Sequence, residues 1–173
     1  PKVSTANTTV SHAIVTDLDG DARPDLVYSV WNDFGWMRGA GDGTFGKPVA
    51  LPTMNIKNGG NLVSGDLDGD RKTDLVLINE NSTSVMTLCS RSNLAMPISN
   101  VDAAGPYAVV TADFDRDGKL DVATVNSLDG RVGLYRGNGD GTLKAPLYFS
   151  IGASHTAIAA GDVDGDGKID LVT

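Results

Sequence analysis

A nine-residue pattern of aspartates, D-x-D-x-D-x-x-x-D, occurs four times in this chain of 173 residues. The copies begin at Asp17, Asp66, Asp113 and Asp162, so that successive copies start 49, 47 and 49 residues apart. A fixed period of roughly 20–50 residues is the signature of repeat architectures, in which every repeat forms one supersecondary unit. The aspartate pattern therefore predicts a chain built from similar units in series.

Strand-like segments flank each copy of the pattern. Short runs of small apolar residues precede it, at 13–16, 61–64, 108–112 and 157–161. More hydrophobic runs follow it, at 26–31, 75–79 and 122–126. A "GDGT" tetrapeptide at 41–44 and 139–142 provides the positive φ angles of a hairpin turn, and residues 87–97 keep a degenerate version. With a further extended segment after Pro48, Pro97 and Pro146, each repeat predicts four antiparallel strands.

Four-stranded antiparallel units of this length are typical of β-propeller blades. We therefore predict an all-β fold, a β-propeller with blades of 47–49 residues, of which this chain holds about three and a half. The predicted order is an outer strand of a preceding blade, three full blades and the start of a fourth, at 1–11, 12–60, 61–107, 108–153 and 154–173. Such a number of blades cannot close a ring. We expect either that the natural chain continues beyond Thr173 or that two chains pair through their open blade edges.

Aspartate dominates the acidic residues: 21 of 22 are Asp, and sixteen of these stand in the four repeated patterns. Neighbouring carboxylates repel by about 1 kcal/mol per pair even at the dielectric constant of water, so a cation is expected among them. The pattern offers oxygen ligands alone, which suits a hard ion such as calcium, with its roughly six to eight ligands. We predict up to four Ca²⁺ sites, which would balance the net charge of −8. Their side-chain ligands are Asp17, Asp19, Asp21, Asp25, Asp66, Asp68, Asp70, Asp74, Asp113, Asp115, Asp117, Asp121, Asp162, Asp164, Asp166 and Asp170.

The four loops differ at their sixth position, where the chain must turn sharply. Gly118 and Gly167 occupy it in the third and fourth loops, whereas Ala22 and Arg71 occupy it in the first and second. If this position requires a positive φ, a residue other than glycine costs about 1 kcal/mol there. We therefore predict weaker calcium binding by the first two loops than by the third.

Other features of the sequence argue against whole classes of function. No basic patch is present, which argues against nucleic acid, and no apolar run approaches the roughly 20 residues of a membrane helix. Cys89 is the single cysteine and is interpreted as a packing residue. His12 and His155 do not occupy equivalent positions, and no framed nucleophile accompanies them. No catalytic residue is assigned, and we do not expect an enzyme.

Three aromatic residues, Trp31, Phe34 and Trp36, crowd the first predicted hairpin in the sequence WNDFGW, whereas the equivalent stretches of the other repeats are polar. Such side chains can form a stacking platform for a sugar or a contact for another protein. Packing between blades is the alternative interpretation, and the sequence leaves it open.

The aspartate loops, the "GDGT" turns and the 47–49-residue period resemble the FG-GAP or VCBS repeats, which build the calcium-loop β-propellers of integrin α-chain heads and of many secreted microbial proteins. The resemblance covers essentially the whole chain and implies a ring of commonly about seven blades. It carries calcium-ligand roles to the sixteen aspartates of the loops. It adds the backbone carbonyl groups of Arg23, Lys72, Lys119 and Lys168.

In such families the propeller is usually an adhesion, glycan-binding or enzyme-accessory module. The resemblance therefore implies a calcium-stabilised binding module, extracellular or periplasmic, that recognises a glycan or protein ligand without membrane insertion. Two alternatives remain, namely the propeller of a secreted carbohydrate-active enzyme and a structural scaffold without a ligand.

Overall fold

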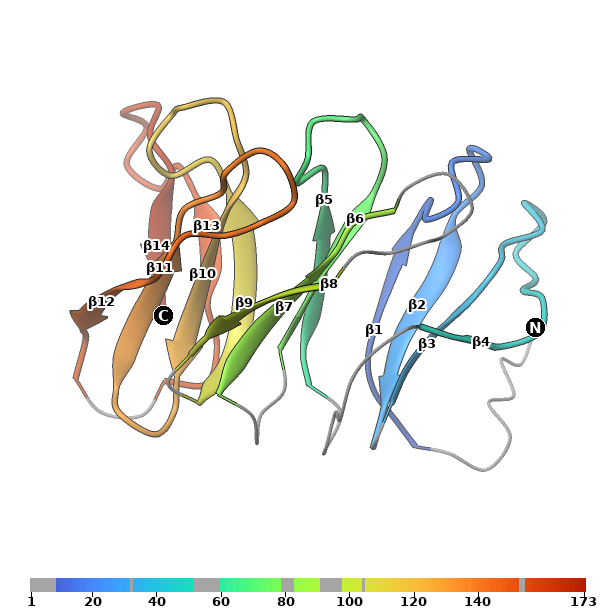
Figure 1. Cartoon of the computed structure of the whole chain (residues 1–173), viewed down its shortest axis with the longest axis horizontal. Coiled ribbons are helices and arrows are strands. Elements are labelled where there is room, and N and C mark those ends of the chain that lie inside the picture. The colour runs from blue at the N-terminus through green and yellow to red at the C-terminus, as the bar shows by residue number, and fades with distance from the viewer. Residues whose placement is uncertain are drawn as a thin grey trace.

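The computed structural model describes residues 9–31, 33–51, 60–78, 83–90, 98–103, 105–152 and 155–173. In these residues the chain forms 14 β-strands and no helix, which confirms the predicted all-β class. The sheets stand side by side and follow one another in chain order (Figure 1). The described part of the chain accordingly contains no helix with the length and apolar character needed to cross a membrane.

Three sheets have four antiparallel strands each, as predicted for propeller blades. The first contains β1 (Val10–Thr16), β2 (Asp25–Val30), β3 (Asp33–Met37) and β4 (Val49–Ala50). The second contains β5 (Leu62–Gly65), β6 (Asp74–Ile78), β7 (Ser84–Leu88) and β8 (Ile98–Asp102). The third contains β9 (Pro106–Ala112), β10 (Asp121–Asn126), β11 (Arg131–Tyr135) and β12 (Leu147–Ser150). The fourth sheet pairs β13 (Ala159–Gly161) with β14 (Asp170–Val172).

Each sheet has one aspartate loop, which joins its first strand to its second. β1 begins at Val10, two residues before the start predicted for the first blade. Residues 1–8, predicted as part of an outer strand of a preceding blade, lie outside the described residues. The blade boundaries therefore stay predictions.

The hydrophobic core lies between consecutive sheets. One cluster joins the first and second sheets through residues such as Val27 and Leu75, and another joins the second and third through Val76 and Tyr135. Every residue of the second strands β6 and β10 is buried, because neighbouring sheets cover both of their faces. The hydrophobic runs that follow the aspartate loops thus hold one sheet against the next.

The first strands of all four sheets lie together. β5 contacts both β1 and β9, and β9 contacts β13. Together they line a hollow of about 540 Å³, formed by Ile14, Val15, Val63, Ser64, Val110, Thr111 and Ala160. The small side chains of these strands permit this close approach, as expected for strands near a propeller axis.

The "GDGT" segments form hairpin turns, as predicted. Asp42 and Asp140 each accept hydrogen bonds from the backbone N–H and the hydroxyl of the threonine two residues later, at 2.6–3.0 Å. The turn of the third sheet also lies against the second: Gly141 N donates to Leu67 O at 3.2 Å, and Thr87 Oγ1 donates to Gly141 O at 2.6 Å. A Cβ atom at Gly141 would lie 2.0 Å from the Sγ of Cys89, so this contact requires glycine.

Candidate metal centres

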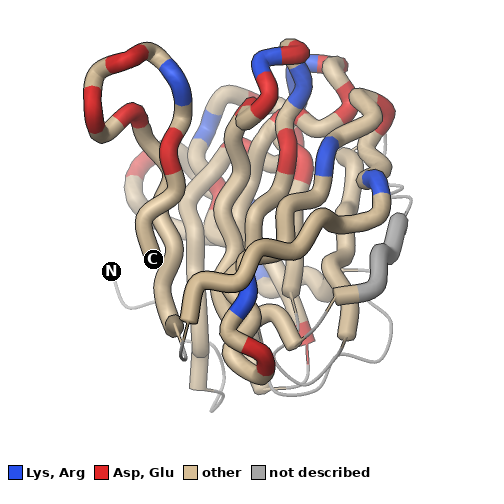
Figure 2. The backbone as a smooth tube through the Cα atoms, turned by 90° about the vertical axis from the view of Figure 1, so that its left-hand side faces the viewer, with Lys and Arg blue, Asp and Glu red and all other residues tan. Residues whose placement is uncertain are grey.

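The four aspartate loops lie at the same edge of the sheets, since each follows a first strand of the same direction (Figure 1). Acidic residues accordingly gather in the loops at one end of the molecule (Figure 2). The hydrogen bonds within these loops repeat from copy to copy, so the aspartate pattern specifies one loop shape.

The first aspartate of each loop closes the turn by accepting backbone N–H groups. Asp17 Oδ1 accepts from Gly20 N at 2.8 Å, and its Oδ2 accepts from Ala22 N at 2.8 Å. Asp66, Asp113 and Asp162 accept from the same region of their own loops, at 2.7–3.1 Å. A short acceptor side chain is needed at this place, which accounts for the preference for Asp over Glu.

The aspartates at the third and fifth positions of each loop accept the backbone N–H group of the residue two positions further along the chain. In the first loop, Asp19 Oδ1 accepts from Asp21 N at 3.2 Å and Asp21 Oδ1 accepts from Arg23 N at 2.9 Å. The other three loops repeat both bonds at 2.7–3.2 Å. The N–H groups of the seventh residues Arg23, Lys72, Lys119 and Lys168 are thereby engaged, and the role of their carbonyl groups as calcium ligands stays a prediction.

In the first three loops, the aspartate at the ninth position joins the loop to the residues that follow the third strand of the sheet. Asp74 is fully buried; its Oδ2 accepts from Leu67 N and its Oδ1 from Ser90 N, both at 2.8 Å. Asp25 and Asp121 make the equivalent pairs of bonds in the first and third sheets. Burial raises the pKa of Asp74 and of Asp121, although the N–H donors act in the opposite direction.

Carboxylate oxygens from three aspartates converge in every loop, with all three atoms within 4.8 Å of one another. The aspartates at positions one and three contribute an oxygen in every loop. The third oxygen comes from the aspartate at position nine in the first, third and fourth loops, and from the aspartate at position five in the second loop. The groups are Asp17–Asp19–Asp25, Asp66–Asp68–Asp70, Asp113–Asp115–Asp121 and Asp162–Asp164–Asp170. Anionic oxygens at this spacing fit a hard divalent cation, so the residues present are compatible with calcium.

The backbone conformation of the loops corrects the prediction that the first two loops bind calcium more weakly than the third. The sixth residues do have positive φ angles, including Ala22 at 63° and Arg71 at 66°. The fourth residues also have positive φ, and in the third loop this residue is Arg116, at 61°. The first three loops thus each place one residue other than glycine in the left-handed region, and the fourth loop places none there. The prediction that the third loop binds calcium better than the first two loses its physical basis.

Two arginines outside the aspartate pattern, which the sequence did not lead us to predict as site residues, contact the first and third loops. Arg38, directly after β3, places Nε 2.7 Å from Asp19 Oδ2 and Nη2 2.9 Å from Asp21 Oδ2. Arg136, directly after β11, places Nε 3.2 Å from Asp115 Oδ2. The repeated "RG" dipeptide at 38–39 and 136–137 is the sequence signal for these ion pairs.

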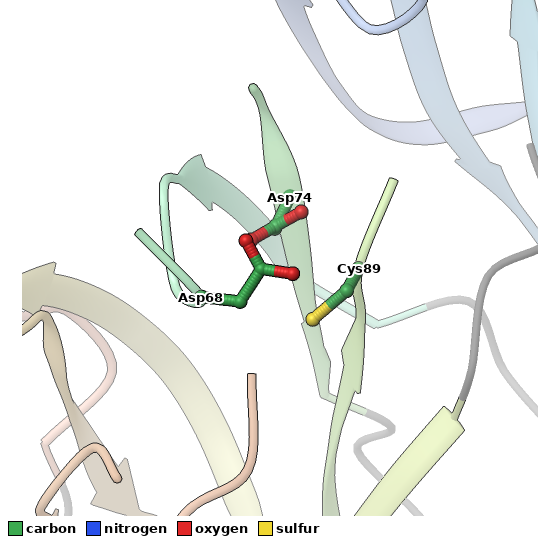
Figure 3. Close-up of side chains that lie close together, drawn as sticks. All are labelled: Asp68, Asp74 and Cys89. Carbon is green, nitrogen blue, oxygen red and sulfur yellow. The ribbon is translucent and has the colours of Figure 1, made fainter. Parts of the chain in front are cut away.

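Cys89 occupies the corresponding place after β7 in the second sheet. Its thiol lies with the carboxylates of Asp68 and Asp74, within 4.8 Å of an oxygen of each (Figure 3). Cys89 is buried beneath Gly141 of the third sheet, in agreement with its interpretation as a packing residue.

The aromatic platform predicted on the first hairpin does not exist as a surface. Phe34 and Trp36 are 1% and 6% exposed, because both belong to the hydrophobic cluster between the first two sheets. Trp31 alone of the three faces solvent, at 67% exposure. The prediction of a three-residue stacking surface is therefore wrong, and packing between blades explains two of its members.

The two histidines lie apart from the acidic groups. His12 lies in β1, is half-buried, and donates its backbone N–H to Ser29 Oγ at 3.1 Å. Neither His12 nor His155 belongs to a group of metal-ligating side chains in the part of the chain that the structure describes.

Comparison with solved structures shows a likeness in fold. A lectin of Agrocybe aegerita that recognises non-reducing terminal N-acetylglucosamine matches with a TM-score of 0.65 and 21% identity, over 92% of this chain and 45% of the lectin. The Photorhabdus luminescens Tc holotoxin pore matches with a TM-score of 0.54 and 22% identity, over 93% of this chain and 8% of the toxin chain. This chain thus spans less than half of either one.

Sequence comparison identifies the repeats. No curated protein matches the chain. The family model for the FG-GAP-like repeat matches three times, at residues 17–77, 66–124 and 113–173, and each match begins at the first aspartate of a loop. Together the matches cover the chain from Asp17 to Thr173, and the chain therefore belongs to the FG-GAP-like repeat family.

Proposed function

We propose that this chain is a calcium-stabilised β-propeller module that binds glycans outside the cytoplasm. The observation that carries the proposal is the convergence of three carboxylate oxygens in each of four loops that repeat one hydrogen-bonded shape. Bound calcium would supply the positive charge that makes such convergence favourable. The absence of catalysis expected from the sequence is part of this proposal.

Calcium would join positions that the loop already brings together. The first, third and fifth aspartates use some of their oxygens to accept backbone N–H groups, which fixes their orientation before any cation arrives. Asp17 Oδ1 accepts N–H groups from both Gly20 and Asp21, whereas Asp17 Oδ2 and Asp19 Oδ1 each accept one and retain a lone pair for a cation. The loops are therefore preorganised for a cation at one edge of the sheets.

The calcium concentrations outside cells support the proposed location outside the cytoplasm. Loops of modest affinity fill at the millimolar calcium outside cells, with dissociation constants of about 10⁻⁴–10⁻³ M in extracellular modules. Three of the loops also contain a residue other than glycine at a positive φ, which favours modest affinity. We therefore propose an extracellular or periplasmic setting.

Glycans are the proposed ligand class because the lectin that shares this fold recognises a terminal sugar. Trp31, between β2 and β3, offers an exposed indole that can stack on a sugar ring. The corresponding turn between β10 and β11 exposes Leu128, at 80%. These apolar side chains lie at the ends of the sheets remote from the aspartate loops, so ligand binding there would leave the cation sites accessible.

A glycan array tests the proposal. The labelled chain is applied in calcium and in EDTA, together with Trp31→Ala and the control Leu128→Ala, which removes an exposed apolar side chain from another turn. We expect binding to a defined set of glycans in calcium, a loss of that binding in EDTA and a selective loss in Trp31→Ala. A folded wild-type chain that binds no glycan in calcium would contradict the proposed ligand class.

A further inference from the structure

Two arginines occupy equivalent places beside the first and third aspartate loops. Arg38 and Arg136 are the first residues after the third strands β3 and β11. The Nε atom of each arginine lies beside the Oδ2 atom of the aspartate at the third position of its loop. The distance is 2.7 Å from Arg38 to Asp19 and 3.2 Å from Arg136 to Asp115. Arg38 also pairs with Asp21 through Nη2, at 2.9 Å.

These arginines engage carboxylates of the converging groups. The Oδ1 atoms of Asp19 and Asp115 already accept backbone N–H groups, each at 3.2 Å. Oδ2 is therefore the oxygen of each carboxylate with the most capacity for a further positive partner, and the guanidinium occupies it. Asp19 and Asp115 also belong to the groups of converging carboxylates, so an arginine and the proposed calcium would bind the same side chain.

We propose that Arg38 and Arg136 compete with the cation for the aspartate at the third position of their loops. Each arginine neutralises its loop in the absence of calcium and moves away from Asp19 or Asp115 when calcium binds. This inference rests on the proposed calcium function and adds a determinant of affinity to it. The Arg38 side chain is 59% exposed, so little packing opposes its withdrawal. A hollow of about 450 Å³ has space for the displaced side chain beside the loop, and its lining consists of Asp21, Arg23, Arg38, Gly39, Ala40 and Gly46.

The competition has a measurable size. Cation binding must break the ion pairs of the exposed Arg38 side chain, and an exposed pair of this kind changes an equilibrium constant by up to about fivefold. Removal of the Arg38 charge should therefore strengthen cation binding by the first loop by up to about fivefold. The same removal should lower the melting temperature in EDTA, because the four carboxylates of the loop lose their internal counter-charge.

Terbium luminescence measures this effect at the first loop. The chain's two tryptophans, Trp31 and Trp36, both belong to the first repeat, and Trp36 is two residues before Arg38. Excitation of tryptophan therefore favours emission from Tb³⁺ bound at that loop, and displacement by Ca²⁺ gives the calcium affinity. Calorimetric titration with Ca²⁺ provides a second measurement that does not depend on the tryptophans.

The variants separate charge from side-chain shape. Arg38→Leu removes the charge, and Arg38→Gln removes it while it keeps an N–H donor and much of the side-chain length. Arg131→Leu is the matched control, because it removes an Arg–Asp pair, with Nε 2.7 Å from Asp129 Oδ2, at the far end of β11 from Arg136. We expect half-saturation at up to about fivefold lower Tb³⁺ and Ca²⁺ in both Arg38 variants, and unchanged values in Arg131→Leu.

Two negative results have different meanings. Equal affinities in the wild type and both Arg38 variants would overturn the competition and leave the proposed calcium function intact. No Tb³⁺ emission and no heat from Ca²⁺ in any of these proteins would overturn both.

Discussion

The second and fourth aspartate loops share one sequence pattern, but the turn of the following sheet covers the second loop, and the described residues include no later sheet beside the fourth. In the second loop Leu67 is 3% exposed and Asp74 is 0% exposed, because the turn at 139–142 of the third sheet lies against this region. In the fourth loop Val163, the counterpart of Leu67, is 69% exposed. The comparison shows that the aspartates fix the shape of a loop, whereas the neighbouring sheet determines how far each of its residues is buried.

Substitution of the aspartate at the ninth position should give the largest difference in the free energy of unfolding between these two loops. Asp74→Ala leaves the buried N–H groups of Leu67 and Ser90 without an acceptor, which is expected to lower the free energy of unfolding by about 4 kcal/mol. Asp170→Ala releases the exposed Val163 N to water, and a loss below about 1 kcal/mol is expected. Urea unfolding in EDTA measures both without a contribution from calcium. Equal losses would contradict the view that the neighbouring sheet sets the difference.

The second position of the loop should give the next largest difference. Leu67 belongs to the cluster between the second and third sheets, so Leu67→Ala is expected to cost about 3 kcal/mol. Val163→Ala removes an exposed side chain and should change the stability by less than about 0.5 kcal/mol. Thermal and urea unfolding of the two variants provide the test, and a large loss for Val163→Ala would show that the fourth loop is covered in solution.

The turn that covers the second loop can be tested with two matched glycines. Gly141 and Gly43 hold the same position in their turns and have similar positive φ angles, 86° and 85°, so alanine carries the same backbone cost of about 1 kcal/mol at both. A Cβ at Gly141 would also collide with Cys89, whereas a Cβ at Gly43 would have no other heavy atom within 4 Å. We expect Gly141→Ala to cost about 2 kcal/mol more than Gly43→Ala.

A double variant identifies the contact responsible. Cys89→Ala removes the Sγ atom that lies 2.0 Å from the added Cβ. The extra cost of Gly141→Ala should therefore fall in the Cys89→Ala background, as a double-mutant cycle would measure. An unchanged extra cost would assign it to another part of the turn.

The smallest expected effect is a difference in titration. Burial raises the pKa of Asp74 above its ordinary value of 3.8, whereas the side-chain and backbone hydrogen bonds from Lys168 lower the pKa of Asp166. The Asp74 contribution to stability is therefore complete below its unfolded-state pKa and is lost as the pH rises through its folded pKa. The Asp166 contribution is present above its unfolded-state pKa and is lost as the pH falls through its folded pKa. Carbon-13 NMR of the side-chain carboxyls in EDTA should find midpoints above 3.8 for Asp74 and below 3.8 for Asp166; the reverse order would contradict this assignment.

The sequence predicted what is local and repeated. The spacing of the aspartates and the "GDGT" turns predicted the sheets and their strand order, because each hairpin is determined by residues close together in the chain. Burial of Phe34 and Trp36 could not be read from the hairpin sequence, because it depends on packing against the second sheet. The conformation of Arg116 was not predicted for a simpler reason: the fourth position of the loop turns as sharply as the sixth, and the prediction of unequal loops depended on the sixth alone.

The arginine pairs were also beyond the motif, although they recur in the sequence. Arg38 lies 17 residues after Asp21, and its contact with the loop depends on the pairing of β2 with β3. Residues distant in sequence thus modify sites whose ligands are adjacent in sequence. This division explains why the aspartate loops were predictable and the determinants of their differences were not.

If a divalent cation holds the aspartate loops together, the melting temperature must differ between EDTA and excess calcium. A single loop filled at about 100 times its dissociation constant adds about 2.7 kcal/mol, which raises the melting temperature of a chain of this size by about 5–10 °C. We predict a rise of at least this size when EDTA is replaced by calcium, with no comparable rise in the presence of magnesium. An identical melting temperature in EDTA and in calcium would contradict the account.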